Sequence, residues 1–67
     1  MKELIISALK NGPLKKADIY KAVKHAFSDV LTEEKQYKKL SNLLQKMKKE
    51  GIVDVRGSAV QAEWFLV

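Results

Sequence analysis

Apolar residues recur at three- and four-residue intervals in three stretches of the chain, which is the spacing of one face of an α-helix. The first stretch predicts a helix over about 3–11, because the Asn-Gly-Pro sequence at 11–13 stops a helix. The second stretch predicts a helix over about 16–27. The apolar positions are Leu4, Ile5, Ala8 and Leu9 in the first stretch, and Ile19, Ala22, Val23, Ala26 and Phe27 in the second.

The third stretch is the longest and predicts a helix over about 33–50. Thr32 supplies a hydroxyl for the N-cap, two acidic residues follow in the first turn, and lysines fill the last turn before Gly51. The predicted buried stripe consists of Tyr37, Leu40, Leu43, Leu44 and Met47.

After Gly51 the helical period gives way to short β-rich runs. These runs predict a hairpin with strands over about 52–56 and 62–67 around a Gly-Ser turn. Alternation along the last strand puts Trp64 and Leu66 on one face, which we expect to cover the helices. A brief extended piece at Leu14 could add to an edge of this sheet, although it is too short for an independent strand.

Three helices followed by a hairpin predict an α+β fold in one domain spanning 1–67. A chain of 67 residues buries roughly 60% of the surface that its unfolded form exposes, enough for one core but not for a deep catalytic pocket as well. The sequence has no cysteine and a single histidine, His25, so we expect no disulfide and no metal site. We also expect no enzymatic activity, no cofactor and no small-molecule substrate, since no nucleophile and base, paired carboxylates or phosphate-binding glycine loop is recognisable.

The net charge of +5 is confined to one part of the chain. Residues 1–34 carry six lysines and five acidic residues, and residues 51–67 carry one arginine and two acidic residues. Residues 35–50 carry six lysines against a single glutamate. The positive excess therefore lies in the third predicted helix.

Because each residue of a helix is rotated by 100° from the one before, a set of polar residues lies on the face opposite the apolar stripe of that helix. The set consists of Lys35, Lys38, Lys39, Asn42, Gln45, Lys46 and Lys49. Five lysines without a glutamate favour a surface that binds nucleic-acid phosphates; the alternative is the ordinary solvated face of a small protein. Asn42 and Gln45 carry amides that can pair with adenine, and Asn42 is the better candidate because it lies centrally; the alternative is a polar surface residue without a role.

The predicted hairpin adds two further candidates, Arg56 and Ser58. Arg56 is the only arginine and precedes a glycine, so it suits a minor groove; the alternative is an ion pair with Asp54 or Glu63 across the hairpin. Ser58 could contact phosphate. Lysines at the start of the second helix either extend the basic surface or are ordinary surface residues, and Trp64 is expected in the core rather than as a stacking platform for bases.

This layout resembles the winged-helix variant of the helix-turn-helix, and the resemblance covers nearly the whole chain. The residues that carry it are Gly12-Pro13-Leu14, Ile19, Val23, Leu40, Leu43, Leu44, Met47, the run Lys48-Lys49-Glu50-Gly51-Ile52-Val53, and Trp64-Phe65-Leu66. The link at 28–32 is longer than the tight turn of the simplest members. The resemblance implies a three-helix winged helix-turn-helix whose C-terminal hairpin is the wing.

The resemblance also implies a non-enzymatic DNA-binding protein, either a transcriptional regulator or a DNA-processing accessory factor. Its third helix would dock in the major groove of double-stranded DNA, with the wing on the backbone or in the minor groove. The alternative is a winged-helix interaction module that binds an acidic surface of a partner protein, and a homodimer would extend the DNA contacts.

We expect a cytoplasmic protein without a membrane partner, nucleoid-associated if its source is a prokaryote or a phage. No apolar run approaches the roughly 20 residues that cross a bilayer, and the first residues are too acidic and too short in apolar length for a signal peptide.

Overall fold

The computed structural model describes residues 1–27, 29–58 and 61–67. The elements in chain order are α1 (Lys2–Leu9), β1 (Leu14–Lys15), α2 (Lys16–Val23), the short 3₁₀ helix η1 (Lys24–Ala26), α3 (Glu33–Lys49), β2 (Val53–Arg56) and β3 (Glu63–Leu66). The strands form one antiparallel sheet in the order β1-β3-β2. The predicted α+β class is confirmed. Across the described residues, no helix combines the length and the apolar character needed to cross a membrane.

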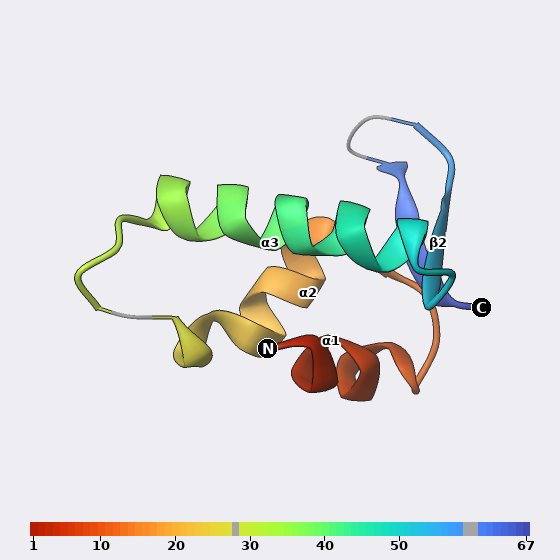
Figure 1. Ribbon diagram of the computed structural model, residues 1–67, viewed down its shortest axis with the longest axis horizontal. Coiled ribbons are helices and arrows are strands. Elements are labelled where there is room, and N and C mark those ends of the chain that lie inside the picture. Colours follow the sequence, from red (N-terminus) through yellow and green to blue (C-terminus); the bar gives the residue numbers. More distant parts are fainter. Residues whose placement is uncertain (28, 59–60) are drawn as a thin grey trace.

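The long helix α3 runs along the molecule, α2 crosses beneath it, and the sheet stands beside the C-terminal end of α3 (Figure 1). The core lies where the three helices meet the inner face of this sheet. Its buried members are Ile5, Leu9, Ile19, Val23, Leu40, Leu44, Met47, Val53 and Trp64. Each helix therefore contributes residues three or four positions apart, as an amphipathic helix must.

The beginning of α3 follows the sequence prediction closely. The Thr32 hydroxyl oxygen accepts a hydrogen bond from the backbone N–H of Lys35 at 3.3 Å, so Thr32 is the N-cap. At the other end, the N–H of Gly51 binds the carbonyl oxygen of Lys48 at 3.0 Å, and Gly51 takes a positive φ of 77°. The predicted range 33–50 thus corresponds to Glu33–Lys49.

The second helix ends earlier than the apolar spacing predicts. At Val23 the backbone (φ −113°, ψ −3°) leaves α-helical geometry, and η1 tightens the next turn. Ala22 and Ala26 are exposed, contrary to their predicted burial, and Phe27 packs against Tyr20 with ring centroids 6.1 Å apart. Burying the Phe27 ring removes more apolar surface from water than burying a methyl group, so packing overrides the helical period.

The first helix is also shifted in roll relative to the prediction. Ile5 and Leu9 are buried as expected, but Leu4 is 36% exposed and Ile6 packs against the core on the other flank. The helix ends at Leu9, two residues before the predicted end. Gly12 adopts a φ of 132°, which lets the chain reverse into β1.

The sheet bears out the predicted inner face of the last strand. Leu14 pairs with Trp64, so the brief extended piece does add to the sheet edge, and Trp64 is buried against the helices. The hairpin strands are Val53–Arg56 and Glu63–Leu66, slightly shorter than predicted, although the N–H of Val67 still binds the carbonyl oxygen of Ile52 at 3.1 Å. Of the predicted turn, Gly57 and Ser58 are described, while 59–60 lie outside the described residues.

Replacing Leu40 with alanine should lower the free energy of unfolding by about 2–5 kcal/mol, because the side chain is fully buried and leaves a cavity. The matched control is Leu4→Ala, which removes the same atoms from a partly exposed site and should cost less than about 1 kcal/mol. Urea unfolding followed by circular dichroism measures both. Equal losses in the two variants would contradict the assignment of the core.

Candidate nucleic-acid interface

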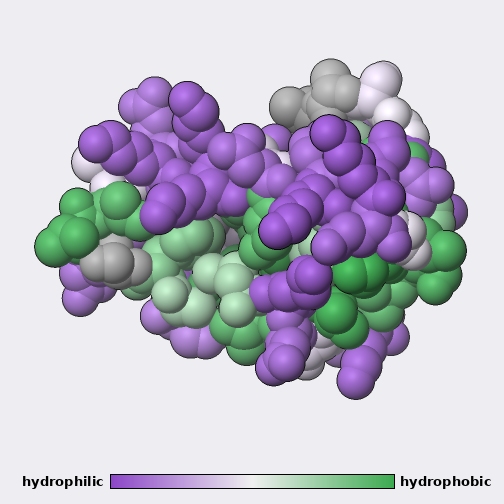
Figure 2. Space-filling view, viewed as in Figure 1, coloured by the Kyte–Doolittle hydropathy of each residue, from purple (hydrophilic) through white to green (hydrophobic). Residues whose placement is uncertain are grey.

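All seven polar residues predicted on one face of α3 are exposed. They are Lys35, Lys38, Lys39, Asn42, Gln45, Lys46 and Lys49, called the α3 face below. Burial of Leu40, Leu44 and Met47 fixes the roll of the helix and turns this face to solvent. Figure 2 shows hydrophilic residues gathered along the helix in this view.

The lysines of the α3 face are not neutralised by neighbouring acids. Within the described part of the chain there are two ion pairs, Lys2 with Glu50 at 3.0 Å and Arg56 with Glu63 at 3.4 Å, and neither involves a lysine of α3. The acidic residues of α3 itself lie in its first turn. The face therefore carries five positive charges, none of them in an ion pair of the described part of the chain, which is an arrangement suited to a polyanion.

A cluster around Tyr20 fixes the N-terminal half of α3 on α2. The Tyr20 hydroxyl donates to Oε1 of Gln36 at 2.6 Å, and Nε2 of Gln36 donates to the carbonyl oxygen of Leu31 at 3.0 Å. The Tyr20 ring also contacts Tyr37 edge-on, with centroids 5.4 Å apart. Both tyrosines are packing residues, as the sequence predicts for Tyr37, and they hold the helix that presents the lysines.

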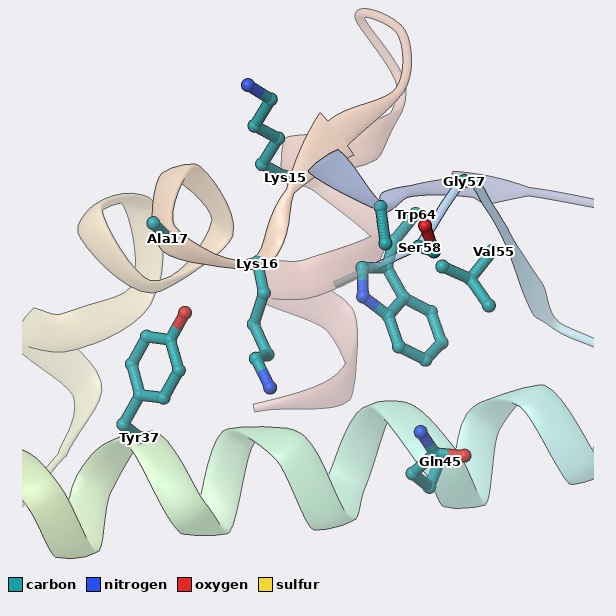
Figure 3. Close-up of a pocket in the computed structure, with 10 residues that line it drawn as sticks. Lys15, Lys16, Ala17, Tyr37, Gln45, Val55, Gly57, Ser58 and Trp64 are labelled. Atoms are coloured by element: carbon teal, nitrogen blue, oxygen red, sulfur yellow. The ribbon is translucent and has the colours of Figure 1, made fainter. Parts of the chain in front are cut away.

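The lysines at the start of α2 do not join the α3 face. Nζ of Lys16 donates to Oγ of Ser41 at 2.8 Å and lies 5.1 Å from the centre of the Tyr37 ring. Lys16 is therefore a half-buried cation between α2 and α3. The neighbouring Lys15 points away from α3, as Figure 3 shows.

Arg56 lies on the outer face of the sheet, opposite the face that carries the buried residues of the strands. The register pairs Arg56 with Glu63, on the outer sheet face, whereas Val53 and Trp64 occupy the inner one. Of the two alternatives predicted for Arg56, the ion pair with Glu63 is formed, and its guanidinium also lies 5.8 Å from the centre of the Phe65 ring. Its side chain remains 64% exposed.

Asp54, the other predicted partner of Arg56, has a different role. Its Oδ1 accepts a hydrogen bond from the backbone N–H of Val55 at 2.8 Å. Ser58 is exposed in the loop after Gly57, whose φ is 84°. The two candidate residues of the hairpin therefore lie in different places, Arg56 on the outer sheet face and Ser58 in the loop.

Sequence reasoning missed a groove between α3, the start of α2 and the hairpin (Figure 3). Its volume is about 590 Å³. The lining residues include Lys16, Tyr37, Gln45, Val55, Ser58 and Trp64. These residues come from four separate segments, and each taken alone has the pattern of either a core or a surface residue, so no sequence signal marks the groove.

The described residues hold no group of three histidine, aspartate or glutamate side chains arranged to bind a metal ion. No protein-family model, curated protein or solved structure matches the chain.

The Tyr20 phenol should titrate above its ordinary range in the folded protein. Burial among its neighbours, and secondarily the negative charge of Glu33, raises the pKa of Tyr20 above 10.0. The unfolded chain then ionises first, so the free energy of unfolding falls as the pH rises past the unfolded pKa. Phenolate absorbance measures the shift in a Tyr37→Phe variant, where Tyr20 is the only tyrosine.

In that background, Glu33→Gln should lower the pKa of Tyr20 but leave it above the value in urea, because burial is the larger cause. A pKa that is already ordinary in the folded Tyr37→Phe protein, or that becomes ordinary on Glu33→Gln, would contradict this account.

Proposed function

We propose that the chain is a non-enzymatic DNA-binding protein of the winged-helix type, a transcriptional regulator or a DNA-processing accessory factor, which inserts α3 into the major groove of double-stranded DNA. The observation that carries the proposal is the α3 face, with its five unpaired lysines and no acidic residue. Lysine binds phosphate as a point charge and contributes sequence-independent affinity.

The dimensions of α3 suit this role. Its 17 residues give a length of about 25 Å at 1.5 Å per residue, and a major groove about 12 Å wide admits an α-helix. Asn42 lies midway between Lys35 and Lys49 on the exposed face. In the proposed complex, lysines toward both ends of the face contact the two flanking phosphate backbones while Asn42 reaches base edges.

The order of elements supports the same proposal. Three helices precede a hairpin that stands beside the C-terminal end of α3 (Figure 1), which is the arrangement that the winged-helix resemblance implies. The hairpin is the proposed wing. Engaging DNA with Arg56 requires opening its ion pair with Glu63, and an exposed pair of this kind contributes only about 0–1 kcal/mol.

A parallel titration of isotope-labelled protein with double-stranded DNA, single-stranded DNA and RNA tests the proposal. We expect duplex DNA to bind most tightly, with amide shifts concentrated over residues 35–49 and affinity falling steeply with salt. A flat duplex titration at about 50 mM salt, or preferred binding of an acidic protein by the same face, would overturn the proposal.

Reversing two charges on the α3 face, Lys39→Glu with Lys46→Glu, should weaken binding to all duplex sequences alike by at least about tenfold at low salt. The slope of log affinity against log salt should become shallower by about 2, since two phosphate contacts are lost. The matched control is Lys10→Glu with Lys24→Glu, which makes the same change in net charge at two exposed lysines outside α3 that form no ion pair in the described part of the chain. Equal losses in both double variants would indicate attraction by net charge rather than by this face.

Substituting Asn42 with alanine should change sequence preference rather than general affinity. Loss of a bidentate contact to adenine removes about 1–3 kcal/mol of discrimination at one base pair and leaves the salt slope unchanged. Selection of binding sites from a random duplex pool, with wild type and variant side by side, measures the preference. The comparison variant is Lys38→Gln, which should reduce the salt slope by about 1 and keep the preferred sequence. Identical site preferences for wild type and Asn42→Ala would rule out this role.

A further inference from the structure

We propose that the groove between α3, the start of α2 and the hairpin binds a small organic anion, a carboxylate carried on a flat apolar body. This inference does not rest on DNA binding. The groove volume of about 590 Å³ lies within the range of small-molecule sites, about 300–1,000 Å³. Its walls combine a few polar groups with a larger apolar surface, which is the composition of such sites (Figure 3).

The carboxylate would bind at Lys16. Its ammonium group is held in place by the 2.8 Å hydrogen bond to Ser41 and by the Tyr37 ring, so little side-chain entropy remains to be lost on binding. Only one of its three N–H donors is used by Ser41. Among the described residues that line the groove there is no aspartate or glutamate, and neither ion pair of the described part of the chain involves Lys16.

Trp64 supplies a second donor for the same carboxylate. Its side chain is only 6% exposed, and its nitrogen-bearing edge faces the Lys16 side of the groove in Figure 3. No acceptor in the described chain binds this indole N–H. Every fully buried side-chain nitrogen or oxygen in that part of the chain has a partner, so the unpartnered indole nitrogen is not fully buried. The N–H of Trp64 is therefore open to the groove, ready to donate to a bound oxygen.

The remaining walls select the body of the ligand. Val55, Ala62 and the indole ring of Trp64 form an apolar side. The charge of the site selects a monoanion over a phosphate monoester, because Lys16 points into the groove while Lys15 points away from it. One fixed cation, one N–H donor and an apolar wall together match a monocarboxylate on an aromatic ring system.

The test uses β-naphthoate as probe and the indole N–H signal of the labelled protein as readout. Trp64 is the only tryptophan of the chain, so this signal is single and reports the groove directly. We expect saturable shifts of the Trp64 indole signal with β-naphthoate, and binding at least tenfold weaker for β-naphthamide, which has the same shape without the charge.

Substituting Lys16 with glutamine should weaken β-naphthoate binding at least tenfold, and Lys16→Arg should retain most of it. The matched control is Lys21→Gln, an exposed lysine of the same helix outside the groove, which should bind as wild type. Absence of an indole shift, equal binding of the acid and the amide, or equal effects of the two glutamine variants would overturn the proposal. The comparison of acid and amide on the wild-type protein decides the matter even where Lys16→Gln unfolds.

Discussion

Burial of three residues of α3 determines most of what the molecule presents to solvent. Leu40, Leu44 and Met47 have no exposed surface, and together they fix the rotation of the helix about its axis. Rotating α3 by one residue would swing its faces through about 100° and bury lysine in the core, which costs far more than the packing could offset. The lysine surface and one wall of the groove both follow from that single constraint.

The parts of the fold that sequence reasoning predicted are those set by local chemistry. The cap at Thr32 and the stripe of α3 depend on residues a few positions apart, and so does the alternation around Trp64. The parts that it missed depend on competition between distant segments. The end of α2 follows from the packing of Phe27 on Tyr20, and the exposure of Leu4 follows from which flank of α1 its neighbours cover.

The candidate site divides in the same way. Exposure of the α3 face follows from helical period alone, so all seven residues could be named from the sequence. The partner of Arg56 depends on the strand register, which left two alternatives open until the pairing with Glu63 was known. The groove requires Lys16, Tyr37 and Trp64 to converge from three segments, and no spacing within any one segment encodes that meeting.

The hydrogen bond from the backbone N–H of Val55 to the carboxylate of Asp54 affects whether two copies of the chain can pair through their sheets. The strand order leaves β2 at the edge of the sheet, and because the pair Ile52 and Val67 is hydrogen-bonded, alternation turns the N–H of Val55 toward the free edge. Oδ1 of Asp54 occupies that N–H at 2.8 Å and adds a negative charge beside it. A second chain adding a strand here would have to displace this carboxylate and bring two such charges together. The charged Asp54 and the shortness of β2 thus both disfavour edge-to-edge association of the sheet.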